Sequence, residues 1–401
     1  MIRILLISYY FPPSSASGAK RWGNIFDSLR LNKDLDFKVL TANWRGNKKQ
    51  KNVYRVGPTI NYIPPKSISN KKNFINRLKH PSEYFRSFSY ETVYGDWKNL
   101  AKKWIDQNSS LKIDIIISSF SPSSSLLLGN YAKLKFNSKL IIDLRDLISM
   151  QGQKMKIPII HQMDQYLDKF FCRNADLILT IGKTTAKKAK EFYKKPTLII
   201  YNSIKSKFKK VQKTQIKNSI TIGYFGSIGY NRNPVNIINI LSNFLYKFEN
   251  YKITLHFASN DNPYDYISDL KKIHPLLKIM YHGYLSKKKL IALEKKCNFL
   301  LILEDQSKFG FENLTGKLFD YMSKSKPIIA SCSKKSDIVG ILNHVTCGMC
   351  VVSLKDFELF LEKVRANYFY SKPKNLKFYS TREQSKKLIE SIKKMIINTN
   401  D

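Results

Sequence analysis

The sequence predicts an α/β protein made of two tandem, doubly wound (Rossmann-like) domains that face a central cleft. Two observations support this fold class. Short apolar runs rich in Ile, Leu and Val alternate with helical patterns along the 401 residues, which is typical of parallel sheets covered by helices on both faces. The series also stops at a polar, lysine-rich stretch, 205–219, and then restarts. We therefore expect a domain boundary near this stretch.

The first domain is predicted to span residues 1–203. Its expected strands are Ile2–Ser8, Phe37–Thr41, Ile113–Ser118, Leu140–Asp143, Leu177–Ile181 and Leu198–Tyr201. The region 48–104 is rich in Lys, Tyr and Phe without a clear period, and we expect a helical insertion there.

The second domain is predicted to span residues 204–378. Its expected strands are Ile220–Phe225, Lys252–Ala258, Ile279–Tyr281, Asn298–Leu303, Pro327–Ser331 and Cys350–Val352. Residues 379–401 carry apolar side chains at helical spacing with lysines on the other face. We expect a closing helix that packs back on the first domain; a terminal helix on the second domain is the alternative.

Composition limits the functional classes. The formal charge of +39 favours either a polyanionic partner or a coding bias that enriches Lys, Asn and Ile. Nucleic-acid motifs are absent, so an anionic membrane surface is the favoured partner. No apolar run approaches the ~18 residues of a membrane span, and the first ten residues lack the pattern of a secretory signal. A cytoplasmic protein at the inner face of the membrane is expected.

Cysteine spacing gives no sign of a metal or redox centre. The five cysteines are scattered, and only Cys347 and Cys350 form a local pair. A zinc site needs a second ligand pair at metal spacing, which neither the cysteines nor the six histidines supply. We expect reduced thiols, no metal and no cofactor.

Two loops of the first domain are candidates for ligand contact, because ligands bind beyond the carboxyl ends of parallel strands. The loop after the first strand contains Gly18, followed by Lys20 and Arg21; a structural turn with a helix cap is the alternative. The strand near residue 140 ends in Asp143-Leu-Arg145-Asp146. An ion pair of Arg145 with a neighbouring carboxylate is one interpretation, while Asp146 is positioned to reach a substrate hydroxyl.

The strongest candidates lie in the second domain. Gly226 closes its first strand, and Arg232 precedes the next helix, an arrangement that suits a phosphate. The segment from Glu312 to Met322 reads E-N-L-T-G-K-L-F-D-Y-M. A helix is expected to start at Thr315-Gly316. Lys317 in its first turn opposes the helix dipole unless an anion is present, and Asp320 could accept hydrogen bonds from sugar hydroxyls. A surface ion pair of Lys317 with Glu312 remains the alternative.

These residues make the chain resemble the GT-B glycosyltransferases, specifically the family-4-like group (glycosyl transferases group 1) of bacterial surface-polysaccharide enzymes. The likeness runs over nearly the whole chain, and its most specific motif is T-G-K-L-F-D-Y-M-S-K-S-K-P-I-I-A. The resemblance implies a nucleotide-sugar donor on the second domain, an acceptor on the first, and transfer with retention of configuration. The family's E-x7-E carboxylate pair maps onto Glu312 and Asp320, as an E-x7-D variant.

One departure from the family pattern concerns the diphosphate. Many members have an Arg and a Lys-Gly after the Y-x-G element, whereas this sequence has Ser227 and then Arg232. Arg232 and Lys317 are expected to take over that charge. The alternatives are a nucleotide-sugar epimerase of the same fold, and a non-catalytic protein that binds a membrane or another polyanion.

Overall fold

The computed structural model describes residues 1–46, 49–61, 95–147, 158–204, 218–229, 232–268, 270, 273–306, 314–369 and 373–397. The chain divides into two compact units. The first unit runs from the N-terminus to strand β7 and also contains the C-terminal helix α15. The second unit contains β8 to α14.

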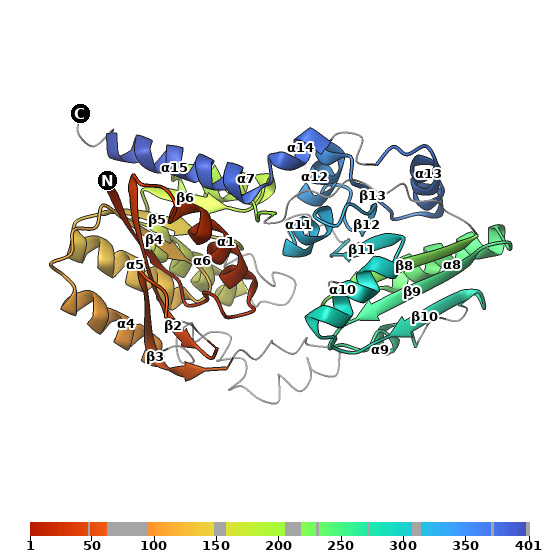
Figure 1. Ribbon diagram of the computed structural model, residues 1–401, viewed down its shortest axis with the longest axis horizontal. Coiled ribbons are helices and arrows are strands. Elements are labelled where there is room, and N and C mark those ends of the chain that lie inside the picture. The colour runs from red at the N-terminus through yellow and green to blue at the C-terminus, as the bar shows by residue number, and fades with distance from the viewer. Residues whose placement is uncertain are drawn as a thin grey trace. The chain divides into compact units, whose positions relative to one another are not determined.

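The first unit has a seven-stranded parallel sheet in the order β3-β2-β1-β4-β5-β6-β7 (Figure 1). Its strands are β1 (Ile2–Ile7), β2 (Leu35–Trp44), β3 (Val53–Ile60), β4 (Ile115–Ser119), β5 (Lys139–Asp143), β6 (Leu177–Thr180) and β7 (Thr197–Ile199). Its helices are α1 (Ser17–Leu29), α4 (Gly95–Gln107), α5 (Ser123–Phe136), α6 (Pro158–Cys172), α7 (Lys183–Tyr193) and α15 (Thr381–Ile397).

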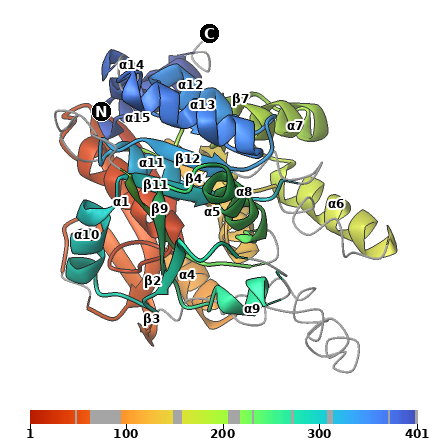
Figure 2. The same cartoon turned by 90° about the vertical axis from the view of Figure 1, so that its right-hand side faces the viewer.

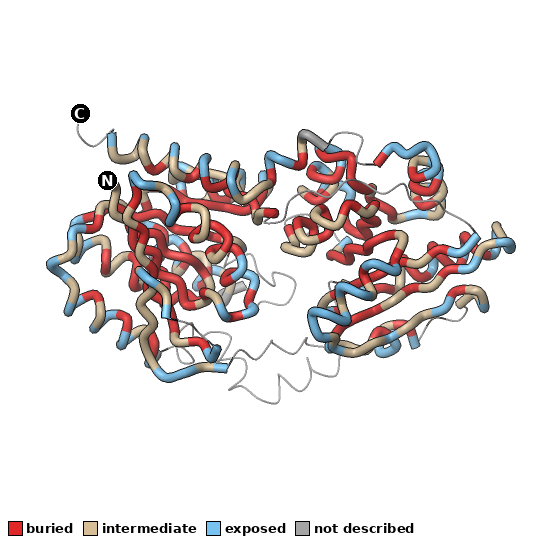
Figure 3. The backbone as a smooth tube through the Cα atoms, in the orientation of Figure 1, coloured by how far each residue is buried: buried red, intermediate tan, exposed pale blue. Residues whose placement is uncertain are grey.

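The sheet of the first unit is covered on both faces. One face packs against side chains of α4, α5, α6 and α7, and the other against α1 and α15. Leu388 and Ile392 of α15 are fully buried in this second cluster. Because both faces are buried, the strands read as continuous apolar runs (Figure 3).

The second unit has a six-stranded parallel sheet in the order β10-β9-β8-β11-β12-β13. Its strands are β8 (Ser219–Phe225), β9 (Lys252–Ala258), β10 (Leu277–Tyr281), β11 (Phe299–Leu303), β12 (Ile328–Ser331) and β13 (Gly348–Cys350). Its helices are α8 (Val235–Lys247), α9 (Tyr264–Ile267), α10 (Lys287–Lys296), α11 (Gly316–Met322), α12 (Asp337–Val345), α13 (Leu354–Arg365) and α14 (Pro373–Lys377). The predicted fold class of two parallel-sheet α/β domains is therefore confirmed.

The described part of region 48–104, predicted as a helical insertion, contains a strand as well as a helix. Val53–Ile60 forms β3, which pairs in parallel with β2 at the edge of the sheet. Its sequence, V-Y-R-V-G-P-T-I, is rich in β-branched residues, and its proline sits where an edge strand tolerates one. Helix α4 is the other described flank, and residues 62–94 lie outside the described part.

The connections between the two units leave and re-enter the first unit at one point. Ile204 forms an isolated parallel bridge with Ser380, and the Ser203 and Thr381 hydroxyls are 3.0 Å apart. The amide of Tyr201 donates to the side chain of Gln384 on α15 at 2.9 Å. The last segment of the first sheet and the start of α15 are thus held together by hydrogen bonds.

Candidate functional site

The candidate site of the second unit lies where the strand order changes direction. Strands β8 and β11 are neighbours in the sheet but are separated in the chain by β9 and β10. Their connections therefore run to opposite sides, which leaves a crevice beyond their carboxyl ends. The loop after β8 carries Gly226 and Arg232, and β11 is followed directly by Glu304.

Helix α11 delivers Lys317 to this edge. The hydroxyl of Tyr321, one turn further along α11, accepts a hydrogen bond from the Phe225 amide at 3.0 Å, which anchors the helix to the end of β8. The Lys317 ammonium donates to the Tyr224 hydroxyl at 2.9 Å and lies 4.5 Å from the centre of the same ring. Burial, reinforced by the positive charge of Arg232, lowers the pKa of Lys317 to about 7.

Arg232 is held by a carboxylate that the sequence did not single out. Its Nε lies 3.1 Å from Oε1 of Glu304, and its Nη1 donates to the Ser227 hydroxyl at 3.1 Å. Glu304 is only 4% exposed, and the Thr315 side chain lies within hydrogen-bonding reach of its carboxylate. Burial raises the pKa of Glu304, against the opposing effects of Arg232 and Lys317.

Glu304 directly follows a buried strand at the switch point. This position is the sequence signal that could have identified it as a site residue. The arrangement places two cations and one buried carboxylate at a single edge. Such a group can bind an anion through the cations and a hydroxyl through the carboxylate.

Gly226 leaves the space that Lys317 occupies. Its φ is +150°, and a Cβ there would lie 2.0 Å from Cε and 2.2 Å from Nζ of Lys317. The glycine is therefore required both by the backbone conformation and by the lysine side chain.

We expect Gly226→Ala to displace Lys317 while leaving the fold intact, because the clashing atoms are at the end of a flexible side chain. The backbone strain should lower the free energy of unfolding by about 1–3 kcal/mol, and binding of an anionic ligand should weaken. Gly283→Ala is the matched control, since its φ is +62° with nothing within 4 Å of the added Cβ. Calorimetric ligand titration of both variants checks this; equal affinities would contradict it.

The other predicted residues of this segment are placed as follows. The helix starts where the sequence predicted: Thr315 occupies the N-cap position of α11, without a side-chain cap hydrogen bond. Gly316 begins the helix, and Asp320 is half-buried one turn later. Since α11 has only seven residues, its dipole adds little, and the charge at this edge comes from Lys317 and Arg232. Glu312 lies outside the described residues.

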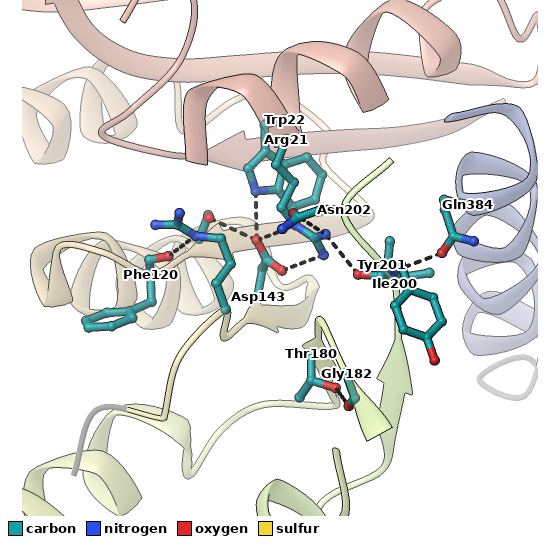
Figure 4. Close-up of polar contacts among 12 residues, drawn as sticks. Arg21, Trp22, Phe120, Asp143, Thr180, Gly182, Ile200, Tyr201, Asn202 and Gln384 are labelled. Carbon is teal, nitrogen blue, oxygen red and sulfur yellow. Dashed lines mark hydrogen bonds and ion pairs between the residues drawn. The ribbon is translucent and has the colours of Figure 1, made fainter. Parts of the chain in front are cut away.

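In the first unit, Arg21 is part of a buried network (Figure 4). Its Nη2 lies 3.0 Å from Oδ1 of Asp143, and its Nη1 donates to the Ile200 carbonyl at 2.8 Å. Asp143 also accepts hydrogen bonds from the Trp22 indole at 2.9 Å and the Ser119 hydroxyl at 3.0 Å. With both charged side chains almost fully buried, Arg21 links α1 to β5 and β7 instead of facing solvent.

One interpretation of the sequence was an ion pair between Arg145 and a neighbouring carboxylate. In the structure, Arg145 instead donates to a backbone carbonyl and a hydroxyl. Its Nε donates to the Phe120 carbonyl at 3.0 Å and its Nη1 to the Ser17 hydroxyl at 2.8 Å. It therefore joins the first turn of α1 to the loop after β4, and its guanidinium covers Gly18, where a Cβ would be 3.0 Å away. Lys20 and Asp146 are exposed.

Within the described residues, no three His, Cys, Asp or Glu side chains are grouped so that they could hold a metal ion. A search of the described helices finds none that combines the length and the apolar character of a membrane span.

Two doubly wound α/β domains in tandem are the GT-B class of architecture. No protein-family model matches this sequence, and no curated protein matches it. Among solved structures, the chain is similar to a sucrose-phosphate synthase from Thermosynechococcus elongatus, with a TM-score of 0.62 and 12% identity over 99% of this chain and 100% of that one.

Two further similarities cover almost the whole chain. HepE from Anabaena, in complex with UDP-glucose, gives a TM-score of 0.55 at 12% identity over 98% of this chain and 100% of that one. A protein of Listeria monocytogenes assigned as a UDP-N-acetylglucosamine 2-epimerase gives a TM-score of 0.51 at 11% identity, over 99% of this chain and 97% of that one. At these identities the likeness establishes the fold and leaves the chemistry to be argued from the site.

Proposed function

We propose that the protein is a glycosyltransferase that moves a sugar from a nucleotide-sugar donor to a glycan or lipid-linked acceptor in surface-polysaccharide biosynthesis. The observation that carries this proposal is the pair of cations, Lys317 and Arg232, at the carboxyl edge of β8 and β11. A diphosphate carries two negative charges and is matched by two such cations. The similarity to HepE with bound UDP-glucose supports this choice of ligand.

The site residues then have distinct roles. Lys317 and Arg232 neutralise the diphosphate, which becomes the leaving group, and stabilise its developing charge. Asp320, with Glu312, contacts sugar and ribose hydroxyls, and Asp146 faces the acceptor. Transfer occurs with retention through positioning and leaving-group stabilisation, without metal or cofactor. Gly18 and Lys20, in the first turn of α1, belong to the acceptor side, at the cytoplasmic face of the membrane.

A panel of nucleotide sugars in a thermal-shift assay tests the proposal directly. A ligand that binds only the folded state stabilises it by RT ln(1 + [L]/Kd), so the melting temperature rises with the logarithm of the ligand concentration above Kd. We expect one nucleotide sugar to raise the melting temperature. Free nucleotide should be formed from this donor only when an acceptor is present. A panel without any shift would contradict the proposal.

A nucleotide-sugar epimerase is the second candidate, favoured by the similarity to the Listeria protein. The two functions are separated by the products. An epimerase converts the donor without any acceptor and releases no sugar to a second molecule, whereas a transferase gives a glycosylated acceptor.

We expect donor binding to weaken as the pH rises above about 7. Burial lowers the pKa of Lys317 to about 7, so the lysine loses its charge above this pH in the free protein. A bound diphosphate favours the charged form and raises that pKa, so binding takes up a proton. The apparent Kd should therefore rise by up to about tenfold per pH unit above 7, until the pKa of the complex is passed.

Isothermal titration between pH 6 and about 9 in buffers of different ionisation enthalpy measures both the affinity and the proton uptake. A nucleotide sugar is the right probe, because its diphosphate is esterified at both ends and does not titrate in this range. Lys317→Met is the control and should give a flat profile. A flat profile in the unchanged protein would contradict the assignment.

A further inference from the structure

Helix α6 buries Phe171 and Cys172 against the sheet and also carries apolar side chains on its outer face. Met163, Tyr166 and Phe170 are 54%, 71% and 37% exposed and recur at helical spacing along one face. Two carboxylates of the same helix, Asp164 and Asp168, are buried at 4% and 0%. A surface helix in water normally buries its apolar stripe and exposes its charges. The outer face of α6 is therefore suited to a partner that is not water.

Cations are interleaved with these apolar side chains. The Arg173 guanidinium carbon lies 4.2 Å from the centre of the Phe170 ring. The Lys169 ammonium lies 4.9 Å from the centre of the Phe192 ring, and this contact joins α6 to α7. Both cations are exposed, and no carboxylate is exposed among the side chains described for α6.

Helix α7 extends the positive surface. Lys183, Lys187 and Lys190 are exposed along it, Lys194 is exposed just beyond its end, and Glu191 is the exposed acid among the α7 residues. Figure 2 shows α6 and α7 on the same side of the first unit. We call the exposed residues of these two helices the α6–α7 face. It combines an apolar centre with surrounding cations.

We propose that the α6–α7 face docks on an anionic lipid bilayer. The apolar side chains enter the headgroup region, where amphipathic tyrosine rings are favoured. Lys169, Arg173 and the lysines of α7 lie at the level of the lipid phosphates, which attract juxtamembrane cations. The net charge of +39 supplies a further long-range attraction to such a surface.

A second copy of this chain is the less suitable occupant. A two-fold contact would bring each residue of the face opposite the same face of the partner, so Lys169 and Arg173 would meet like charges with no exposed carboxylate on α6 to offset them. The charge of the face and of the whole chain therefore favours an anionic partner over self-association. Docking of the α6–α7 face does not require the donor site of the second unit.

Vesicle flotation with the full chain tests the proposal. We expect the protein to float with phosphatidylcholine vesicles that contain about one third phosphatidylglycerol, and to bind pure phosphatidylcholine vesicles about tenfold more weakly. The triple variant Met163→Ser, Tyr166→Ser, Phe170→Ser should lose about tenfold or more in binding to the anionic vesicles. Lys169→Gln with Arg173→Gln should weaken the binding and its dependence on salt.

A matched control changes exposed apolar residues elsewhere, Leu31→Ser, Tyr246→Ser and Leu359→Ser, which are 77%, 51% and 41% exposed. It should float like the unchanged protein. The proposal is overturned if the α6 triple variant also floats normally, if the unchanged protein ignores anionic vesicles, or if light scattering shows a dimer that the α6 variant abolishes.

Thermal melting and the donor-induced shift are measured on the same variants. The donor shift should be unchanged in the α6 triple variant, because its substitutions lie in the first unit; the melting temperature should fall only slightly, from the loss of the Phe170 ring that packs on Phe171. Loss of vesicle binding with an intact donor shift therefore separates membrane docking from the proposed transfer reaction. A missing donor shift in the unchanged protein would contradict the proposed function and leave the vesicle result standing.

Discussion

Lys317→Met is expected to weaken nucleotide-sugar binding by about one to two orders of magnitude. Charge-assisted hydrogen bonds contribute about 1.5–3 kcal/mol, and Lys317 is one of two cations assigned to the diphosphate. Its side chain is already seated at the site by the Tyr224 hydroxyl at 2.9 Å and by the space over Gly226. Because the side chain is already ordered, binding costs little further conformational entropy. Removal of the charge should therefore lower the binding free energy by nearly the full contribution of the contact.

The fold should tolerate this substitution, because methionine keeps an aliphatic stem in the space over Gly226 and removes a cation whose pKa burial has already lowered. Lys335→Met is the matched control, an exposed lysine of the same unit, and should bind normally. Asp320→Ala should also weaken binding. If the thermal shift survives both Lys317→Met and Asp320→Ala, this segment does not hold the donor.

Asp143→Ala is expected to lower the free energy of unfolding by about 3–5 kcal/mol. Removal of one partner of a buried ion pair leaves the other charge buried without compensation. Asp143 accepts hydrogen bonds from Arg21, Trp22 and Ser119, so three donors lose their acceptor at once. Urea denaturation monitored by Trp fluorescence measures the loss, with thermal melting as a second probe.

A different Arg–Asp pair of the same unit provides the comparison. Arg3 and Asp114 make a bidentate contact with side chains 33% and 26% exposed, so Asp114→Ala should destabilise the protein less than Asp143→Ala. The double variant Arg21→Met, Asp143→Leu should recover much of the loss, since it removes both buried charges. Equal losses for Asp143→Ala and Asp114→Ala would contradict the buried-pair account.

The fold was predictable because its signals are local. Strands buried on both faces need continuous apolar runs, and Lys252–Ala258 was predicted with the bounds that β9 has. The miss at β3 has a physical reason as well. An edge strand is only half-buried, so its sequence keeps polar residues and a proline and loses the apolar signature.

The candidate site was predictable only in part. Gly226, Arg232 and Lys317 carry sequence signals, namely a glycine at a strand end and cations in strand-to-helix loops. Glu304 does not, because its role depends on a contact with Arg232, 72 residues away in the chain. For the same reason the sequence did not indicate that Arg21 pairs with Asp143. The two residues are 122 positions apart, and the sequence left the ion pair of Arg145 with a neighbouring carboxylate as one interpretation.

The contact between Ile204 and Ser380 has a consequence for synthesis on the ribosome. In terms of chain topology, the second unit is an insertion into the first, since the chain returns to its point of departure. The part of the sheet face that receives Leu388 and Ile392 stays uncovered until α15 has been made. The inserted unit can therefore fold before its host is complete, the reverse of the usual N-terminal-first order.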